Sequence, residues 1–230
     1  MATQQPDETL PLRHLDGLTD LFSAGYPALA PGSAPITEMG YPGHIAVSGP
    51  DAAETFVADR VRDGVDYLKI LAEDPEKPGA NALGPKTVAA LVDAAHRHGL
   101  KAIGHAIDDA SYRLVIQAGM DIVTHVPMPS VLSADLTRDG LVACPTLVQM
   151  RGICATIGST LPAPLDYENA RASVHRLHQA SVTILAGTDA NADPTAPFSP
   201  PHDKALHEEL RLLVDAGLRG PNKGVGRVCR

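Results

Sequence analysis

The sequence predicts an α/β fold, namely a (β/α)8 barrel of the TIM type that is incomplete because only about six strands can be counted. Short apolar runs alternate with amphipathic stretches of about 10 to 15 residues, which is typical of right-handed βαβ units around a parallel sheet. No glycine-rich phosphate loop of the G-x-G-x-x-G kind follows an early strand, which disfavours a doubly wound sheet. Polar residues recur instead at four successive strand ends, where a barrel places its functional groups.

The first part of the chain is predicted to hold one strand before a long loop and a helix. The strand at 20–25 runs into a segment at 26–50 that is rich in proline and glycine. A connection of this length inside a compact domain indicates a functional segment. The helix at 51–62 has apolar residues at helical spacing and ends at Gly64, after which the next strand occupies 65–70.

The rest of the chain repeats the order of strand and then helix. Each helix is predicted from apolar residues at i, i+3 and i+4 and from a glycine or polar break after its last turn. The segment at 146–165 is predicted to be a long loop with a helical piece, and the loops at 26–50, 146–165 and 192–201 are expected to line a pocket. The predicted strands are 100–104, 121–125, 141–145 and 182–186, and the predicted helices are 85–98, 108–118, 130–138, 166–179 and 203–215.

Composition excludes several classes of partner. The chain has 230 residues and a formal net charge of -8, without a basic patch, which argues against binding to nucleic acid or to an anionic membrane surface. No apolar run approaches the ~20 residues of a membrane helix, and no signal peptide is visible. The odd cysteine count, without metal-type spacing, favours a reducing cytoplasm. We expect a cytoplasmic protein, and assembly as a homo-oligomer stays open; the cysteines are Cys144, Cys154 and Cys229.

Four polar residues each lie at the C-terminal end of a different predicted strand: Lys69, His105, His125 and Asp189. Because these ends of parallel strands meet at one pole of a barrel, we expect the four side chains to share a site. Imidazole nitrogens and carboxylate oxygens are the usual ligands of Zn²⁺ and related catalytic metals. The sequence therefore predicts a site for one or two divalent metals, with zinc as the first choice and manganese or cobalt as alternatives.

The expected chemistry assigns a role to each of these four side chains. His105 and His125 supply neutral nitrogens, and Asp189 supplies an oxygen and takes the proton from a metal-bound water. The metal lowers the pKa of that water and polarises a substrate carbonyl. Lys69, if its amine is carboxylated by CO₂ at N6, becomes an anion able to bridge two metals ~3.5–4 Å apart.

Ordinary roles compete with this interpretation. A lone histidine at a strand end is commonly structural, an aspartate after Gly-Thr is commonly a helix N-cap or turn residue, and a strand lysine commonly faces solvent. Lys69 could also form a Schiff base with a carbonyl substrate, and the chain could be a non-catalytic barrel fragment that pairs its strand edges with another chain. His44 is a weaker candidate metal ligand, and Arg151 a weaker candidate for binding a substrate carboxylate.

Five short motifs occur in a characteristic order over residues 20–218, and together they resemble the amidohydrolase superfamily, most closely its imidazolonepropionase and Xaa-Pro dipeptidase-like branch. The resemblance implies metal-dependent hydrolysis of an amide, peptide or cyclic amide bond in a small molecule. It implies that Lys69 is the carboxylated bridging lysine, that His105 and His125 bind one metal, and that Asp189 is a ligand and proton shuttle. The motifs are Asp66-Tyr67-Leu68-Lys69-Ile70, Gly104-His105-Ala106, Thr124-His125-Val126, Ala186-Gly187-Thr188-Asp189-Ala190 and the run at 206–218.

The sequence departs from this family pattern at both ends. The His-x-His pair of the family's first strand is absent before Lys69, and the similar His96-Arg97-His98 ends a helix at the opposite pole. The resemblance implies that the first two barrel strands, the N-terminal β-sandwich and the C-terminal continuation are missing, with catalysis impaired. Residues 1–218 are thus predicted to be a partial metal-dependent hydrolase barrel, and 219–230 an unrelated-looking basic tail.

Overall fold

The computed structural model describes residues 10–13, 15–17, 19–77, 79–161 and 163–218, and the predicted basic tail at 219–230 lies outside them. Internal contacts divide the chain into two compact units. Unit 1 comprises the described residues up to His105 together with Gln117–Met120. Unit 2 comprises Ala106–Ile116 and the described residues from Asp121 onward.

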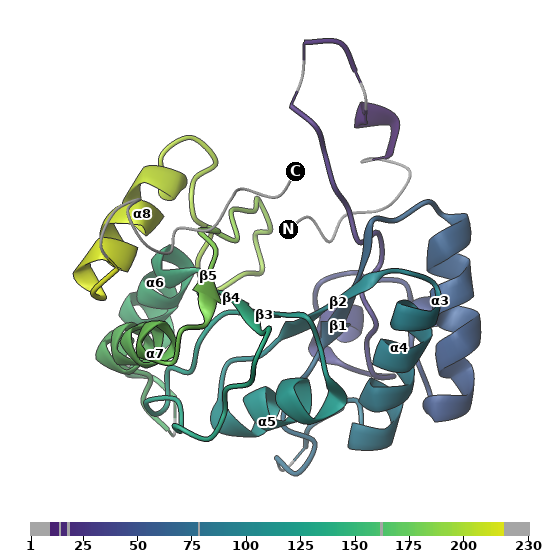
Figure 1. Cartoon of the computed structure of the whole chain (residues 1–230), viewed down its shortest axis with the longest axis horizontal. Helices are drawn as coiled ribbons and strands as arrows, with labels where there is room; N and C mark the ends of the chain where they lie inside the picture. The colour runs from purple at the N-terminus through teal and green to yellow at the C-terminus, as the bar shows by residue number, and fades with distance from the viewer. Residues whose placement is uncertain (1–9, 14, 18, 78, 162, 219–230) are drawn as a thin grey trace. The chain divides into compact units, whose positions relative to one another are not determined.

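Unit 1 contains two parallel strands covered by helices. The strands β1 (Tyr67–Leu71) and β2 (Lys101–His105) pair in a register that runs from Tyr67 opposite Lys101 to Leu71 opposite His105. Helix α4 (Pro85–Arg97) packs on both strands and on α3 (Ala53–Arg62), as Figure 1 shows. The inner face of α4 carries the apolar residues that its spacing predicts, which are buried: Val88, Leu91, Val92 and Ala95.

A strand predicted at 20–25 is not formed, so the described residues contain five strands rather than six. Phe22 in that stretch is half exposed, whereas Ala28 and Leu29 a few residues later are fully buried. Ala28 takes the place beside β1: its N–H donates to the Lys69 carbonyl at 2.8 Å, and its carbonyl accepts from Leu71 N at 3.1 Å. Short helical turns fill the rest of this region: η1 (Leu10–Leu12), α2 (Ala34–Thr37), η2 (Gly43–Ile45) and η3 (Pro50–Ala52).

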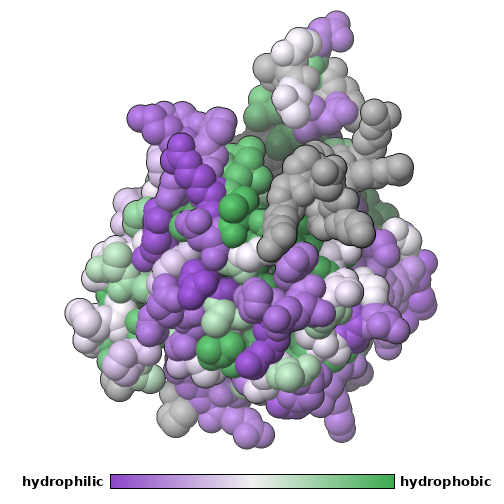
Figure 2. Space-filling view, turned by 60° about the vertical axis from the view of Figure 1, so that its left-hand side comes forward, coloured by the Kyte–Doolittle hydropathy of each residue, from purple (hydrophilic) through white to green (hydrophobic). Residues whose placement is uncertain are grey.

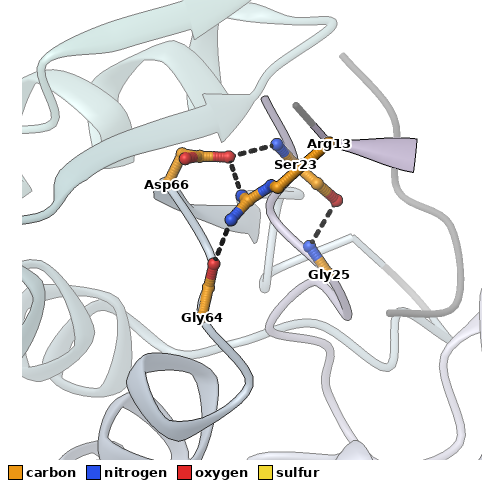
Figure 3. Close-up of polar contacts among 5 residues, drawn as sticks. All are labelled: Arg13, Ser23, Gly25, Gly64 and Asp66. Atoms are coloured by element: carbon orange, nitrogen blue, oxygen red, sulfur yellow. Dashed lines mark hydrogen bonds and ion pairs between the residues drawn. The ribbon is translucent and has the colours of Figure 1, made fainter. Parts of the chain in front are cut away.

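A polar cluster fastens the N-terminal segment to the start of β1 (Figure 3). The Arg13 guanidinium donates to the Gly64 carbonyl at 2.6 Å and pairs with the Asp66 carboxylate. The same carboxylate accepts from Ser23 N at 2.6 Å, and the Ser23 hydroxyl accepts from Gly25 N at 3.0 Å. Because Asp66 precedes the first residue of β1, this cluster lies at the end of the strand opposite to its C-terminal end and has a structural role.

Unit 2 contains three parallel strands that pair in chain order, with Ile122 opposite Val142 and Val142 opposite Thr183. Helices α6 (Leu147–Ile157), α7 (Tyr167–Gln179) and α8 (Ala205–Asp215) pack on one another, and α7 contacts β5 (Thr183–Ile184), as Figure 1 shows. Helix α6 is the helical piece predicted within the segment at 146–165, and it occupies more than half of that segment. The other elements of this part are α5 (Asp109–Ala118), β3 (Ile122–Thr124) and β4 (Val142–Cys144).

The helix predicted at 130–138 is wrong, because the structure has only turns there. Leu132 N donates to the Ser173 hydroxyl of α7 at 2.8 Å, and the Leu132 carbonyl accepts from Arg176. Ser133 N donates to the Asp109 carboxylate of α5 at 3.3 Å. These backbone groups bind neighbouring helices instead of forming the i to i−4 bonds of a helix.

Helix α8 leaves part of its apolar face exposed. Leu213 is buried, but Leu206, Leu210 and Val214 are 49%, 43% and 57% exposed, although all four share the predicted apolar face. Figure 2 brings this side of Figure 1 forward and shows hydrophobic surface flanked by hydrophilic residues. Among the described residues, no helix has both the length and the apolar character that crossing a membrane requires.

Candidate functional site

In unit 1, Lys69 and His105 lie on the same face of two neighbouring strands. The register places Lys69 opposite Ile103, and Leu71 opposite His105, the last residue of β2. Because side chains alternate along a strand, these four residues share one face. Lys69 and His105 are diagonal neighbours on it, since His105 lies two residues beyond Ile103, the partner of Lys69. Lys69 is 7% exposed, so a solvent-facing role for this lysine is wrong.

In unit 2, His125 immediately follows β3 and has a left-handed backbone with φ of 73°. Such a conformation is uncommon for a residue with a side chain and persists only where the surroundings hold it. Here the His125 N–H donates to the Cys144 carbonyl at 2.9 Å, and the His125 carbonyl accepts from the Tyr112 hydroxyl at 2.7 Å. Burial raises the pKa of Tyr112, so its phenol keeps the proton that it donates.

The His125 ring is held by the segment that follows β4. Its Nδ1 lies 2.7 Å from Oγ1 of Thr146, and that hydroxyl also donates to the Pro145 carbonyl at 2.8 Å. Thr146 is buried and, with φ of 52°, has a left-handed backbone as well. Neither Thr146 nor Tyr112 is among the residues predicted from the sequence. Thr146 follows the strand that lies, in chain order, between those of His125 and Asp189, and this place is the signal that could have identified it.

Asp189 lies in the loop that follows β5, and its φ of 53° is again left-handed. Its carbonyl accepts from Asn191 Nδ2 at 2.9 Å, which makes a tight turn. A helix N-cap role is wrong, because the next helix begins only at Ala205. Among the described residues other than glycine, four have a positive φ, and three of these lie in the segments after β3, β4 and β5.

Gly187 brings the Asp189 loop close to the end of β4. A Cβ at this glycine would lie less than 3.0 Å from Sγ of buried Cys144 and 4.0 Å from Cγ2 of Thr146. A side chain at Gly187 therefore does not fit. The glycine of the Ala-Gly-Thr-Asp-Ala motif thus serves the close packing of the segments that follow β4 and β5.

Glu209 of α8 is a buried acid that binds the N-terminus of α6. Its two carboxylate oxygens accept from Leu147 N at 3.0 Å and from Val148 N at 2.8 Å, the first N–H groups of that helix. Burial raises the pKa of Glu209 to about 7, although the two backbone donors and Arg151 act in the opposite direction. This residue lies in the run at 206–218, where the sequence alone suggests no role for it.

Glu209 is expected to make the protein less stable as the pH rises from about 4.5 to about 7. In this window the folded state holds a proton on Glu209 that the unfolded chain has lost, so the free energy of unfolding falls by up to about 3 kcal/mol. In Glu209→Gln this component should be absent. Denaturant unfolding at pH 5 and pH 8 checks it: the stability of the variant relative to the wild type should increase with pH. Equal pH dependence in both proteins would contradict the assignment.

The weaker candidate residues have other partners. His44 is exposed, and its ring lies edge-on to that of Tyr26, with centroids 6.5 Å apart. His98 follows α4, and its Nε2 lies 2.8 Å from the Glu54 carboxylate, as expected for the end of a helix. Arg151 pairs with Glu208 of α8 at 3.0 Å, which accounts for its charge without a substrate.

Within the described ranges, no group of three or more His, Cys, Asp or Glu side chains is placed to hold a metal ion. The predicted set contains three such residues. One of them, His105, belongs to unit 1 with Lys69, and His125 and Asp189 belong to unit 2. The four-residue metal site therefore stays a prediction.

No family model and no curated protein sequence matches this chain. Solved structures with a (β/α) barrel fold do match it, and this chain spans about half the length of each. The expected α/β fold with parallel strands, as an incomplete barrel of this kind, is thereby confirmed.

Three of these structures are particular hydrolases. A Xaa-Pro dipeptidase with methionine bound in its active site has a TM-score of 0.69 at 20% identity, over 91% of this chain and 57% of that one. An A. niger ochratoxinase has a TM-score of 0.66 at 16% identity, over 86% and 50%. A prolidase complexed with N-methylphosphonate-L-proline has a TM-score of 0.62 at 17% identity, over 90% and 56%. At these identities the likeness establishes the fold alone.

Proposed function

We propose that this chain is a metal-dependent hydrolase of C–N bonds, acting on an amide, a dipeptide or a cyclic amide. The observation that carries the proposal is His125. A buried histidine at a strand end, with a left-handed backbone held by two backbone hydrogen bonds and a ring held by one, is a costly arrangement. Such strain collects at functional sites, and the end of a barrel strand is where this fold places them.

The residue types of the candidate ligands suit a divalent metal. Two imidazoles and a carboxylate, from His105, His125 and Asp189, match the three protein ligands of many catalytic zinc sites. Lys69 fits only as an N6-carboxylated anion, because an ammonium group repels a cation. When bound, the metal supplies Lewis acidity, which lowers the pKa of a water molecule and polarises the substrate carbonyl.

Each protein group has one task in the proposed reaction. The ring nitrogens of His105 and His125 would hold the metal, and carboxylated Lys69 would add a negative charge to its ligands. A carboxylate oxygen of Asp189 accepts the proton of the attacking water and returns it to the departing nitrogen. Asp189 is suited to this because its turn holds it at the strand end.

The ligands bound by two structural neighbours favour dipeptides as the first substrates to test. One neighbour is a Xaa-Pro dipeptidase with bound methionine, and another is a prolidase complexed with a proline derivative. One ligand is an amino acid and the other is an amino-acid derivative. A screen should therefore start with Xaa-Pro dipeptides and proceed to other dipeptides and cyclic amides.

Metal content tests the proposal directly. Protein from cells grown with added zinc and bicarbonate should contain about one or two equivalents of metal per chain. His105→Ala and His125→Ala should each lose most of it, because each removes one ligand. Elemental analysis of the purified proteins gives the measurement.

His98→Ala is the matched control, because His98 already pairs with Glu54 at the end of a helix. It should leave the metal content unchanged. Wild-type protein without metal would overturn the proposal, and the chain would then be a non-catalytic barrel fragment. Loss of metal in the control would show that the ligands are assigned wrongly.

A further inference from the structure

We infer that Thr146 is a positioning residue that fixes His125 in the tautomer with hydrogen on Nδ1, so that Nε2 is the metal-binding atom. The inference builds on the proposed function, and it adds a residue that the family motifs do not include. Three groups carry it: the His125 ring, the Thr146 hydroxyl and the Pro145 carbonyl, which form one hydrogen-bonded chain.

The tautomer follows from counting protons. A hydroxyl has one hydrogen, and the Pro145 carbonyl, 2.8 Å from Thr146 Oγ1, can only accept. The Thr146 hydrogen therefore points at Pro145, and its oxygen must accept from Nδ1, which lies 2.7 Å away. If Nδ1 lacked a hydrogen, one of the two contacts would place two acceptors against each other. In the neutral ring, the lone pair then belongs to Nε2.

The hydroxyl is itself held in place by the start of α6. Thr146 is the residue before that helix, and its left-handed backbone is strained for a β-branched residue. The next two N–H groups, of Leu147 and Val148, donate to the buried Glu209 carboxylate at 3.0 and 2.8 Å. Glu209 thereby anchors the turn that aims Thr146 at His125, so α8 supports the ring through α6.

A fixed tautomer matters to a metal ligand. Hydrogen bonding of the other ring nitrogen orients a ligating histidine and raises its basicity, and loss of such a partner typically weakens metal binding about 10- to 100-fold. The His125 backbone is fixed as well, by Cys144 and Tyr112. Thr146 supplies the remaining constraint, on the rotation of the ring and on the position of its hydrogen.

The experiment uses ¹⁵N NMR of metal-free protein at about pH 8.5, where imidazole is neutral. A His125→Gln sample identifies the signal. Wild type and Thr146→Ser, which keeps a hydroxyl, should show the Nδ1–H tautomer. Thr146→Val and Thr146→Ala should shift toward Nε2–H, the ordinary preference in water. The alanine variant has no branched side chain at this left-handed backbone position, so it is less strained than the valine variant. It provides the same test if the valine variant does not fold.

Zinc titration of the same proteins gives the second readout. The dissociation constant should rise about 10- to 100-fold in the valine or alanine variant and stay near the wild-type value in the serine variant. A Nδ1–H tautomer that persists without the hydroxyl overturns the inference. If wild type binds no zinc but the tautomer shifts as expected, the proposed function fails while the role of Thr146 is supported.

Discussion

Asp189→Asn is expected to lower kcat/KM for a hydrolysed dipeptide by about 10²- to 10⁴-fold, because an amide oxygen cannot take up the proton of the attacking water. The fold should survive, since asparagine has nearly the same shape and tolerates a left-handed backbone as well as aspartate does. The carbonyl contact with Asn191 does not involve the substituted atoms. Rates measured at saturating metal, together with unfolding curves, separate lost chemistry from lost structure.

Asp193→Asn is the matched control for this prediction. Asp193 lies in the same loop, and its carboxylate accepts from Thr195 N at 2.8 Å within a local turn. The same chemical change there should leave the rate within a few-fold of the wild-type value. If Asp189→Asn retains wild-type activity, Asp189 does not accept the proton, and the proposed water activation is wrong.

Gly187→Ala is expected to reduce the free energy of unfolding by about 1 to 3 kcal/mol, through overpacking against Cys144. The added Cβ would meet a buried sulfur at less than 3.0 Å, so the strand ends must separate. The Asp189 loop would move with them, and the rate should fall too. Denaturant unfolding checks the stability, with Gly43→Ala as the control because no atom beyond its own chain neighbours lies within 4 Å of its Cβ position.

A second substitution makes the cause of this effect testable. In Gly187→Ala/Cys144→Ala the obstructing sulfur is gone. The free energy of unfolding of this double variant should therefore be close to that of Cys144→Ala alone. Residues in contact typically show coupling of about 0.5 to 3 kcal/mol in such a double-mutant cycle. Additive effects of the two substitutions would show that Cys144 is not the obstacle.

Local patterns predicted the elements that carry the candidate site. The apolar spacing of α4 and the alternation of strands and helices depend on contacts within a few residues, and the structure confirms both. His105 ends β2 and His125 directly follows β3 as predicted, whereas Lys69 is the third of the five residues of β1 rather than its last. The comparison with solved structures confirms the barrel type of the fold.

Contacts between distant residues decided the rest. The stretch at 130–138 has helical spacing but forms turns, because α5 and α7 bind its backbone groups. Ala28 replaces the predicted strand at 20–25 because burial beside β1, rather than local propensity, selects the paired segment. Periodicity within a window of sequence contains no information about such partners.

The sequence by itself determined the type of fold and the identity of four candidate ligands, because both depend on residue types at strand ends. Only the tertiary structure decided how one of them, His125, is held. Its partner Thr146 lies 21 residues along the chain, and Glu209 lies 62 residues beyond the first amide that it binds. Neither pairing has a local signature, since each arises only when separate strands and helices pack together and bury polar groups that must then be satisfied.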